Sequence, residues 1–456
     1  MSQVTGMRSS ELAELARTRA SHKIAKRLIP FLILCYFVAY LDRVNVGFAA
    51  LTMNKDLGFD AEIFGFGTGI FFFGYFIFEV PSNILLERFG ARIWIARIMI
   101  SWGIVSACMA FVTGPTSFYV VRFILGVAEA GFFPGIILYL TYWFTAEERA
   151  RWIGLFMAAI PLSSVIGGPI SGLILDHMDG ALGLKGWQWL FILEGLPSII
   201  VGLITLTYLD DKPSGAAWLD PGERAAVSAR LDVERANREA IKSFSLVEAM
   251  TNPRILALSL VYFGIVSGNY GLGFFLPTII KGVAQKLQLD AATGIGINTL
   301  TGYLVAIPYA CAVVAMIWWS RRSDVVGERV MHVAVPAIVG GIALAAAAYL
   351  ANPLLALIAL TICAVCTYAA LPTFWALPTA FLTGTAAAAG IALVNSIGNL
   401  GGFVGPDMMG RLTKAYGAPT LGLVFLSGCY VVAGLVTLIL GHDRRMEMAG
   451  SIEPAE

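Results

Sequence analysis

The most informative segment of this chain is LIPFLILCYFVAYLDRVNVGF, residues 28–48. It carries no charge from residue 28 to residue 41, and then Asp42 and Arg43 follow. A helix needs about 20 apolar residues to cross the roughly 30 Å of hydrocarbon in a bilayer, so the stretch predicts a membrane-spanning helix. Residues 1–27 are polar and basic, and no small-residue cleavage site follows the apolar run. The segment therefore indicates a retained anchor and not a cleaved signal peptide.

The whole chain has the composition of a membrane protein. Of its 456 residues, 58% are hydrophobic and 13% are charged, whereas soluble domains carry charge on about a quarter of their residues. The net charge of +1 offers no basic surface for nucleic acid. All six cysteines lie in apolar runs. Cys363 and Cys366 form a CxxC pair, but it lies within a span with no His or carboxylate beside it, so we interpret the two as small apolar residues of a helix. We expect no disulfide framework, no metal and no cofactor.

Twelve segments have the length and hydropathy of membrane spans. They are residues 28–48, 64–86, 93–113, 117–143, 152–176, 187–209, 255–280, 293–319, 330–350, 353–383, 386–410 and 419–441. In the loops, the terminal segments and the ends of the spans, 23 Lys and Arg residues fall on the side of the termini and six on the other side. The positive-inside rule then predicts that both termini are cytoplasmic, in a multi-pass protein of the inner or plasma membrane.

The longest polar stretch, residues 210–254, divides the spans into six and six. We predict an all-α membrane protein made of two six-helix bundles, residues 28–209 and residues 255–441, with a cytoplasmic N-terminal segment, 1–27, and tail, 442–456. Within the cytoplasmic linker, 210–254, Asp220 and Pro221 have the residue types of an N-cap and first helical position. We expect an amphipathic helix from there to about residue 240, without chemistry of its own.

The two halves contain a repeat. Glu87-x-x-Gly90-x-Arg92 after the second span is matched by Asp324-x-x-Gly327-x-Arg329 after the eighth, 237 residues later. Parallel repeats of six spans are a common architecture of secondary transporters, with the binding site between the halves near the middle of the membrane.

Four of the ionisable residues inside spans stand out, since each such residue costs at least about 2.5 kcal/mol there and normally has a partner and a role. They are Asp42, Arg43, Arg122 and Glu129. At about 1.5 Å per residue, Asp42 and Arg122 reach the same depth from opposite faces, so we predict that they pair across spans one and four. Glu129 lies two turns beyond Arg122 without an evident local cation, which makes it a candidate proton carrier. Arg43 offers a fork suited to a carboxylate.

An alternative remains open for these four charges: their role could be limited to pairing with one another and holding two helices together. A similar choice remains open for other polar groups within spans, which could bind a substrate or form hydrogen bonds to neighbouring helices; they are Tyr40, Tyr75, Asn269, Asn298, Asn395 and Asn399. For Glu79 and Glu194 we expect gating or packing before proton coupling.

Several motifs together resemble the anion:cation symporter family of the major facilitator superfamily, over residues 28 to 441. They are Tyr40-Leu-Asp42-Arg43-Val-Asn45, Pro81-Ser-Asn83 leading into Leu86-Glu87-Arg88-Phe89-Gly90-Ala91-Arg92, RFILGVAEAGFFP from Arg122 to Pro134, and Asn395-Ser-Ile-Gly-Asn399-Leu-Gly-Gly402. The resemblance implies two bundles with alternating access and a cavity lined mainly by spans one, four, seven and ten. Its members import tartrate, sugar acids, aromatic acids and similar carboxylates.

The resemblance also implies roles for residues. Asp42 and Glu129 would be proton-linked, Arg43 and Arg122 would recognise the anion, and Tyr40, Tyr75 and Asn395 would contact it. A cytoplasmic gate would comprise Glu87, Arg88, Gly90, Arg92, Asp324 and Arg329. Glu87 stands where the family usually has Asp, and span five has no Gln of the kind that some sugar-acid carriers use.

We therefore expect a monomeric symporter of a small organic anion and a proton. One rival is a proton-coupled exporter of a cationic or drug-like compound, against which the two buried arginines speak. The other is a membrane enzyme or receptor, for which the sequence offers no catalytic set of side chains, so we expect no enzyme activity.

Overall fold

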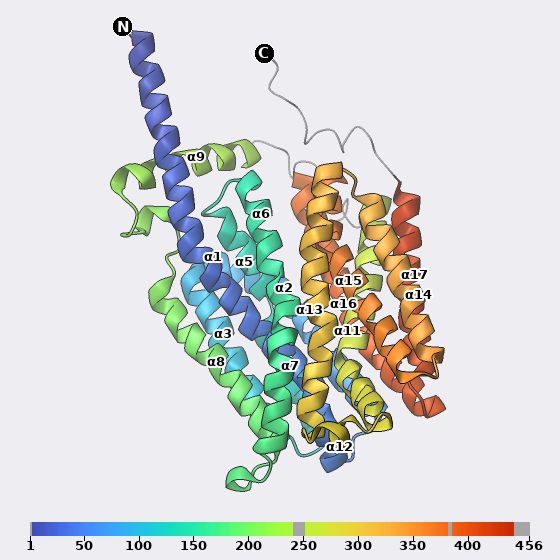
Figure 1. Ribbon diagram of the computed structural model, residues 1–456. Coiled ribbons are helices and arrows are strands. Elements are labelled where there is room, and N and C mark those ends of the chain that lie inside the picture. The colour runs from blue at the N-terminus through green and yellow to red at the C-terminus, as the bar shows by residue number, and fades with distance from the viewer. Residues whose placement is uncertain (1, 240–250, 382–384, 442–456) are drawn as a thin grey trace.

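The computed structural model describes residues 2–239, 251–381 and 385–441, and this part of the chain forms helices without any strand (Figure 1). The elements are α1 (Ser2–Leu57), α2 (Ala61–Phe89), α3 (Ala91–Cys108), η1 (Met109–Phe111), α4 (Pro115–Glu129), α5 (Phe132–Thr141), α6 (Ala146–Met157), α7 (Ala159–His177), η2 (Ala181–Gly183), α8 (Gly186–Tyr208), η3 (Pro213–Gly215), α9 (Pro221–Glu239), α11 (Pro253–Lys286), α12 (Leu289–Thr293), α13 (Ile297–Val326), α14 (Val330–Tyr349), α15 (Pro353–Phe381), α16 (Thr385–Tyr416) and α17 (Thr420–Leu440).

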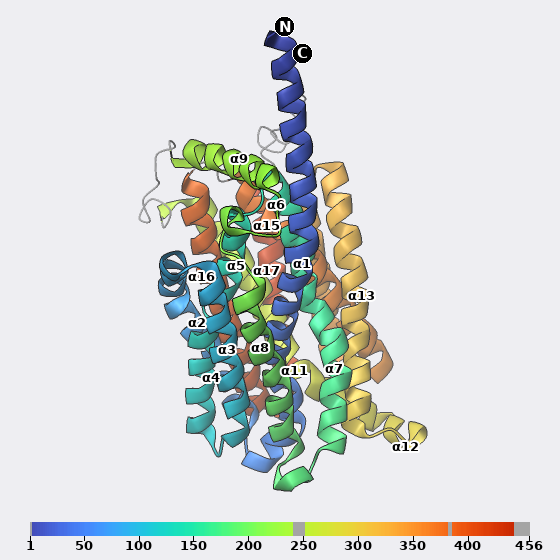
Figure 2. The ribbon, with the colours of Figure 1, turned by 90° about the vertical axis from the view of Figure 1, so that its left-hand side faces the viewer.

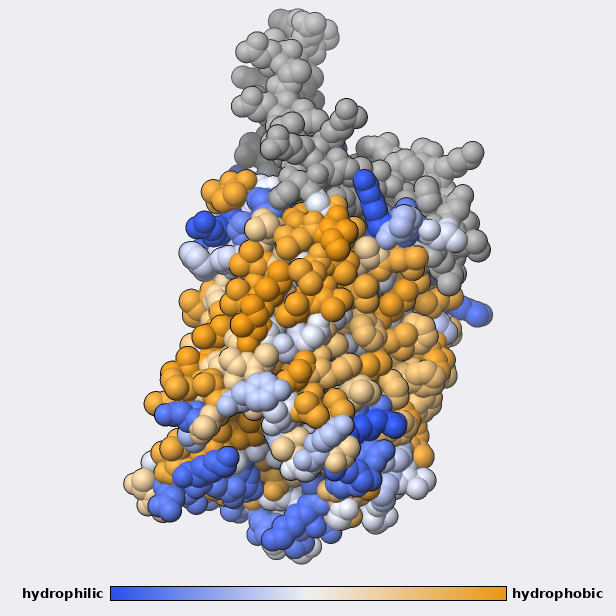
Figure 3. All heavy atoms as spheres, turned by 90° about the vertical axis from the view of Figure 1, so that its right-hand side faces the viewer, coloured by the Kyte–Doolittle hydropathy of each residue, from blue (hydrophilic) through white to orange (hydrophobic). Residues whose placement is uncertain are grey.

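The prediction of an all-α protein with twelve spans is confirmed. Within the described residues, eleven helical segments are long and apolar enough to cross a membrane. The twelfth crossing is α16, which has 32 residues and packs beside α2 and α11. Large apolar side chains remain exposed on the outside of the spans, among them Val314, Ile342 and Ile439. Figure 3 shows the resulting apolar belt on one flank, above a polar rim.

Three predicted spans differ in detail. The first is part of a single helix of 56 residues that begins at Ser2 and continues beyond residue 48. The fourth is divided into α4 and α5, because Gly131 adopts the left-handed conformation (φ 83°) that glycine tolerates best. The fifth is divided into α6 and α7 around Ala158. The break in the fourth span follows directly after Glu129.

The helices form two halves that lie side by side, α1 to α8 and α11 to α17 (Figures 1 and 2). They meet along α2 with α16, α7 with α13, and α1 with α11. Glycines allow the backbones to approach closely: a Cβ on Gly302 would lie 2.2 Å from the carbonyl oxygen of Gly168, and one on Gly65 would lie 2.4 Å from that of Pro406. These close contacts bring the side chains of α1, α2, α11 and α16 within reach of one another.

The linker helix α9 begins at Pro221, as predicted, and packs against α1 near Lys23, part of the way along that helix. Lys23 joins the two helices through ion pairs to Asp220 (3.0 Å) and Glu223 (2.8 Å). Residues 240–250 of the linker and the predicted tail, 442–456, lie outside the described residues.

Candidate functional site

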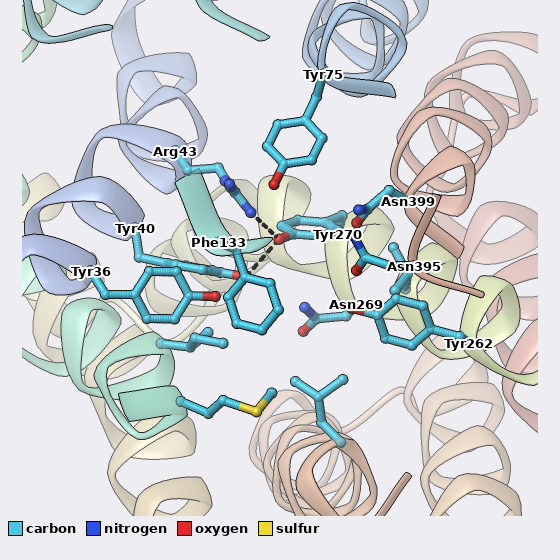
Figure 4. Close-up of a pocket in the computed structure, with 14 residues that line it drawn as sticks. Tyr36, Tyr40, Arg43, Tyr75, Phe133, Tyr262, Asn269, Tyr270, Asn395 and Asn399 are labelled. Atoms are coloured by element: carbon cyan, nitrogen blue, oxygen red, sulfur yellow. Dashed lines mark hydrogen bonds between the residues drawn. The ribbon is translucent and has the colours of Figure 1, made fainter. Parts of the chain in front are cut away.

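A cavity lies between the two halves (Figure 4). Its lining side chains surround about 480 Å³ of space, which includes open solvent. Its wall is formed by Tyr36, Tyr40, Arg43, Tyr75, Phe133, Met157, Ile160, Tyr262, Val266, Asn269, Tyr270, Leu371, Asn395 and Asn399. These residues come from spans one, four, seven and ten, which the resemblance implied, and also from spans two, five and eleven.

Arg43 is the cation in this wall. Residues 36, 40 and 43 share one face of α1 because they are spaced four and three residues apart. The Arg43 guanidinium donates from Nη1 to the Tyr270 hydroxyl (2.8 Å), which shares a hydrogen bond with Tyr40 (2.7 Å). The guanidinium carbon also lies 4.8 Å from the ring centre of Tyr40 and 5.7 Å from that of Tyr75. An aromatic cage therefore holds the cation at the edge of the cavity.

Glu129 is the partner of Arg43. Its carboxylate forms a buried ion pair with Nη2 of Arg43, and the two side chains are only 3% and 8% exposed. The prediction that Glu129 lacks a local cation is therefore wrong. Glu129 is the last residue of α4, before the break at Gly131. The end of this helix places the carboxylate behind the cavity wall, against the arginine that lines it.

Asp42 faces away from the cavity, and its predicted pairing with Arg122 is wrong. Its carboxylate accepts hydrogen bonds from Trp102 Nε1 (2.9 Å) and Ser106 Oγ (2.8 Å) on α3, and from Ser198 Oγ on α8. Successive helical residues point about 100° apart, so the neighbours Asp42 and Arg43 face different helices. Asp42 thereby joins α1 to α3 and α8 within the first half.

Arg122 is also behind the wall and is fully buried. It donates long hydrogen bonds to the carbonyl oxygens of Gly67 (3.4 Å) and Thr68 (3.3 Å) on α2, and no carboxylate of the described residues lies within 4.0 Å of it. Its guanidinium carbon lies 5.0 Å from the ring centre of Phe71, and that of Arg43 lies 5.4 Å from the same ring. One phenylalanine thus separates the two buried cations.

The wall opposite Arg43 belongs to the second half and combines neutral polar groups with the apolar Val266 and Leu371. Asn269, Asn395, Asn399 and Tyr262 point into the cavity there (Figure 4). Of the predicted substrate-binding residues, Tyr40, Arg43, Tyr75 and Asn395 line the cavity, whereas Arg122 does not. Asn298 lies elsewhere, near the face opposite the termini.

Sequence analysis missed Tyr36, Tyr262 and Tyr270. The first could have been found, because it lies one turn before Tyr40 on the same face of α1. Nothing in the sequence of span seven distinguishes its two tyrosines from packing residues.

The two repeated turns lie at matching positions. Gly90 ends α2 with φ 88°, and Gly327 ends α13 with φ 71°. In the second turn Arg329 pairs with Asp324 (2.6 Å). In the first, the backbone N–H of Arg92 donates to Asp211 (2.9 Å), while Glu87 and Arg88 are exposed. Both turns contain a glycine with a positive φ, but ψ is 147° at Gly90 and 13° at Gly327. Their role as a gate stays a prediction.

Polar contacts join the two halves at one face of the molecule, on the side away from the C-terminal end of α17. Lys414 of α16 pairs with Glu62 of α2 (2.7 Å) and with Asp60 (3.0 Å). The backbone N–H of Ile63, which bonds to Asp60, and the nearby Lys414 lower the pKa of this carboxyl. Asp60 therefore stays ionised above about pH 4, the ordinary value for Asp.

A second group of contacts lies at the same face. Asp176 of α7 accepts from Asn298 Nδ2 (2.8 Å) and from the backbone of Thr299 (2.7 Å) on α13. We call these two groups of contacts the opposite-face lock.

The site contains no metal centre within the described residues, since no group of three His, Cys, Asp or Glu side chains converges there. What the geometry offers is one cation whose single ionic partner is a buried carboxylate. A ligand carboxylate in the cavity could replace that partner.

Comparisons with known proteins agree with this arrangement. The family profile described as Major Facilitator Superfamily matches residues 32–406. A protein of Agrobacterium vitis named "Putative tartrate transporter" is 50% identical over 440 residues, which are 96% of this chain and 98% of that protein. A "Quinolone resistance transporter" of Acinetobacter baumannii is 40% identical over 414 residues, 91% of this chain and 93% of that one.

Among solved structures, the xylose transporter XylE from E. coli has a similar fold, with a TM-score of 0.69. The sequences are 12% identical, and the match covers 95% of this chain and 98% of that one.

Proposed function

Since the chain is a membrane transporter that belongs to the Major Facilitator Superfamily, we propose that it imports a small organic anion together with a proton. The observation that carries this proposal is the ion pair of Arg43 with Glu129 at the edge of the cavity. Arg43 can bind the carboxylate of Glu129 or that of a substrate, and a proton on Glu129 decides between them.

The coupling follows from charge. With Glu129 ionised, Arg43 is neutralised and has little attraction for an anion. A proton on Glu129 removes that neutralisation, and the planar guanidinium can then take a carboxylate by two parallel hydrogen bonds. The buried site is neutral before and after proton and anion bind together. Because an unpaired buried charge is costly, the fully empty and fully loaded forms change conformation more easily than a half-loaded form.

Release reverses these steps. Loss of the proton restores the carboxylate of Glu129, which competes with the substrate for Arg43 and displaces it. Asp42 is the second proton-linked carboxylate in this proposal. It accepts hydrogen bonds from three donors on α3 and α8, and protonation would reduce its capacity to accept them. Its proton would therefore act on helix contacts in the first half and not on the substrate.

Alternating access supplies the path. The opposite-face lock and the close glycine contacts join the halves on one side of the cavity. We propose that this face is the outer one and that the conformation is inward-facing, with both termini in the cytoplasm. The distribution of Lys and Arg supports this orientation. Transport would then open the lock and close the halves at the repeated turns.

Neutral donors and acceptors on the second half would hold the body of the anion. Relatives named for tartrate transport support a hydroxylated acid, and the tyrosines of the cavity also suit an aromatic acid. We propose the carboxylate class as a whole, with the chain working as a monomer.

Reconstituted vesicles test the proposal. Purified protein in vesicles with an acidic outside should accumulate a labelled carboxylate, and a protonophore should abolish the accumulation. A panel of tartrate, sugar acids and aromatic acids would identify the substrate by the rise in melting temperature that binding produces. No accumulation and no thermal shift with any acid would refute the proposal.

The second candidate is proton-coupled export of a drug-like compound. It is favoured by the relative named for quinolone resistance and by the aromatic lining of the cavity. Arg43 in the wall disfavours a cationic compound. Proton-driven efflux of a quinolone from vesicles, with no uptake of carboxylates, would favour this candidate over import.

A further inference from the structure

A second buried carboxylate borders the cavity, on the side away from the opposite-face lock. Glu79 lies on α2 one turn beyond Tyr75 and is 4% exposed. Its carboxylate accepts hydrogen bonds from Asn395 Nδ2 and from Ser396 Oγ (3.3 Å), both on α16. It has no ion pair with any described cation. The proposed coupling mechanism makes no use of this group.

The contact determines how the Asn395 side chain is turned. An ionised carboxylate only accepts hydrogen bonds, so the amide nitrogen of an asparagine must face it. In the structure the amide nitrogen of Asn395 faces one carboxylate oxygen of Glu79, and the Ser396 hydroxyl lies against the other. The amide oxygen of Asn395 is then left for the cavity, whose wall this residue forms opposite Arg43 (Figure 4).

We propose that Glu79 is a positioning residue that makes Asn395 present a hydrogen-bond acceptor to the substrate. The site then selects an anion that bears a hydroxyl group in addition to its carboxylate, with the carboxylate on Arg43 and the hydroxyl donating to Asn395. This inference rests on the proposed function and narrows its substrate class to hydroxy acids.

The selection has a physical basis. A site built to bond a hydroxyl rejects the analogue without it, because the polar group of the site is left unpaired in the complex. With one such bond we expect a preference of about tenfold for an acid with a hydroxyl over its deoxy analogue. Replacing Glu79 by glutamine removes the constraint, because a glutamine amide can bond either end of Asn395. The preference should then fall below about threefold.

Tartrate, malate and succinate test this inference, since they share a four-carbon dicarboxylate skeleton and differ in their hydroxyl groups. Inhibition constants are measured against counterflow of the best substrate in vesicles. The wild type should bind malate about tenfold more tightly than succinate, with tartrate at least as tight as malate. Glu79→Gln should bind malate and succinate within about threefold and keep its counterflow.

Two further variants serve as matched tests. Ser396→Ala removes the other donor to Glu79 but leaves its bond to Asn395, and it should keep the wild-type preference. Asn395→Ala removes the acceptor itself without requiring Glu79 to change, and it should lose the preference even if Glu79→Gln does not fold.

The failures can be told apart. A wild type that neither binds nor transports any acid refutes the proposed function. A wild type that transports acids without a hydroxyl preference, or an Asn395→Ala or Glu79→Gln variant that keeps the preference, overturns only this inference.

Discussion

Replacing Glu129 with glutamine removes the proposed proton carrier while keeping the size and shape of the side chain. The carboxylate is the ionic partner of Arg43, and both side chains are almost fully buried. In the variant, Arg43 keeps its bond to Tyr270 (2.8 Å) and its contact with the Tyr40 ring. It no longer has a carboxylate that a proton can neutralise. We expect that Glu129→Gln binds the anion but does not couple its movement to protons.

The magnitude follows from the energy of the gradient. One pH unit is equivalent to about 1.4 kcal/mol per proton, so coupling one proton to one anion supports about tenfold accumulation per unit. In Glu129→Gln the accumulation ratio should fall to about one. Breaking a buried ion pair typically costs about 3–5 kcal/mol because the remaining charge is uncompensated. A substrate carboxylate on Arg43 would recover part of that cost, so substrate binding should be as tight as in the wild type or tighter.

Vesicles with an outside one to two pH units more acidic than the lumen provide the assay. Accumulation of labelled substrate is measured beside counterflow at equal pH, and affinity is measured between pH 5 and 8. In the wild type the affinity should rise as the pH falls, and in Glu129→Gln it should be independent of pH. Asp290→Asn, on the short helix α12 outside the spans, is the matched charge-removing control. Proton-driven accumulation at the wild-type rate in Glu129→Gln would refute the coupling mechanism.

Three further predictions concern the contacts around the site. Asp42→Asn and Arg122→Gln should each lower the melting temperature, and the two decreases should add in the double variant because the residues share no partner. Strong non-additivity would instead support a direct interaction between these two charges. Lys414→Gln removes two exposed ion pairs of the opposite-face lock, each contributing about 0–1 kcal/mol, and should shift the population towards the open lock by up to about fivefold per pair. Distances between spin labels on α2 and α16 would measure that shift, and an unchanged distribution would contradict the role of the lock. Gly126→Ala would place a methyl group 1.9 Å from the carbonyl oxygen of Phe71, whereas Gly154→Ala meets nothing within 4 Å; we expect loss of folded protein for the first and an equal or higher melting temperature for the second.

Much of the site was predictable because the free-energy cost of burying a polar or charged side chain in the membrane makes such residues rare within spans. Arg43, Tyr40, Tyr75 and Asn395 were selected as polar groups inside apolar spans, and all four line the cavity. The importance of Glu129 was likewise visible, although its partner was not. The matched turns at Gly90 and Gly327 were found by their spacing, since only glycine adopts a positive φ without strain.

The errors concern which charges meet. Counting residues along a span gives the depth of a side chain in the membrane, and it placed Asp42 and Arg122 at the same depth. It does not give the direction of the side chain around the helix axis or the identity of the neighbouring helix. Asp42 faces α3 and α8, and Arg122 faces the backbone of α2. The break after Glu129 lies at Gly131, where an added Cβ would come 2.4 Å from the hydroxyl oxygen of Ser82 on α2.

The number of membrane spans and the polar residues buried among them can be read from local hydropathy, measured against the thickness of a bilayer. The pairing of Arg43 with Glu129, and the tyrosines and asparagines of the second half that complete the cavity, emerge from the packing of the helices. The physical reason is that every span must be apolar to lie in lipid, and this shared pattern carries little information about which helix packs beside which. That choice depends on the shapes of the helix surfaces, such as the glycines that bring α2 to α16 and α7 to α13.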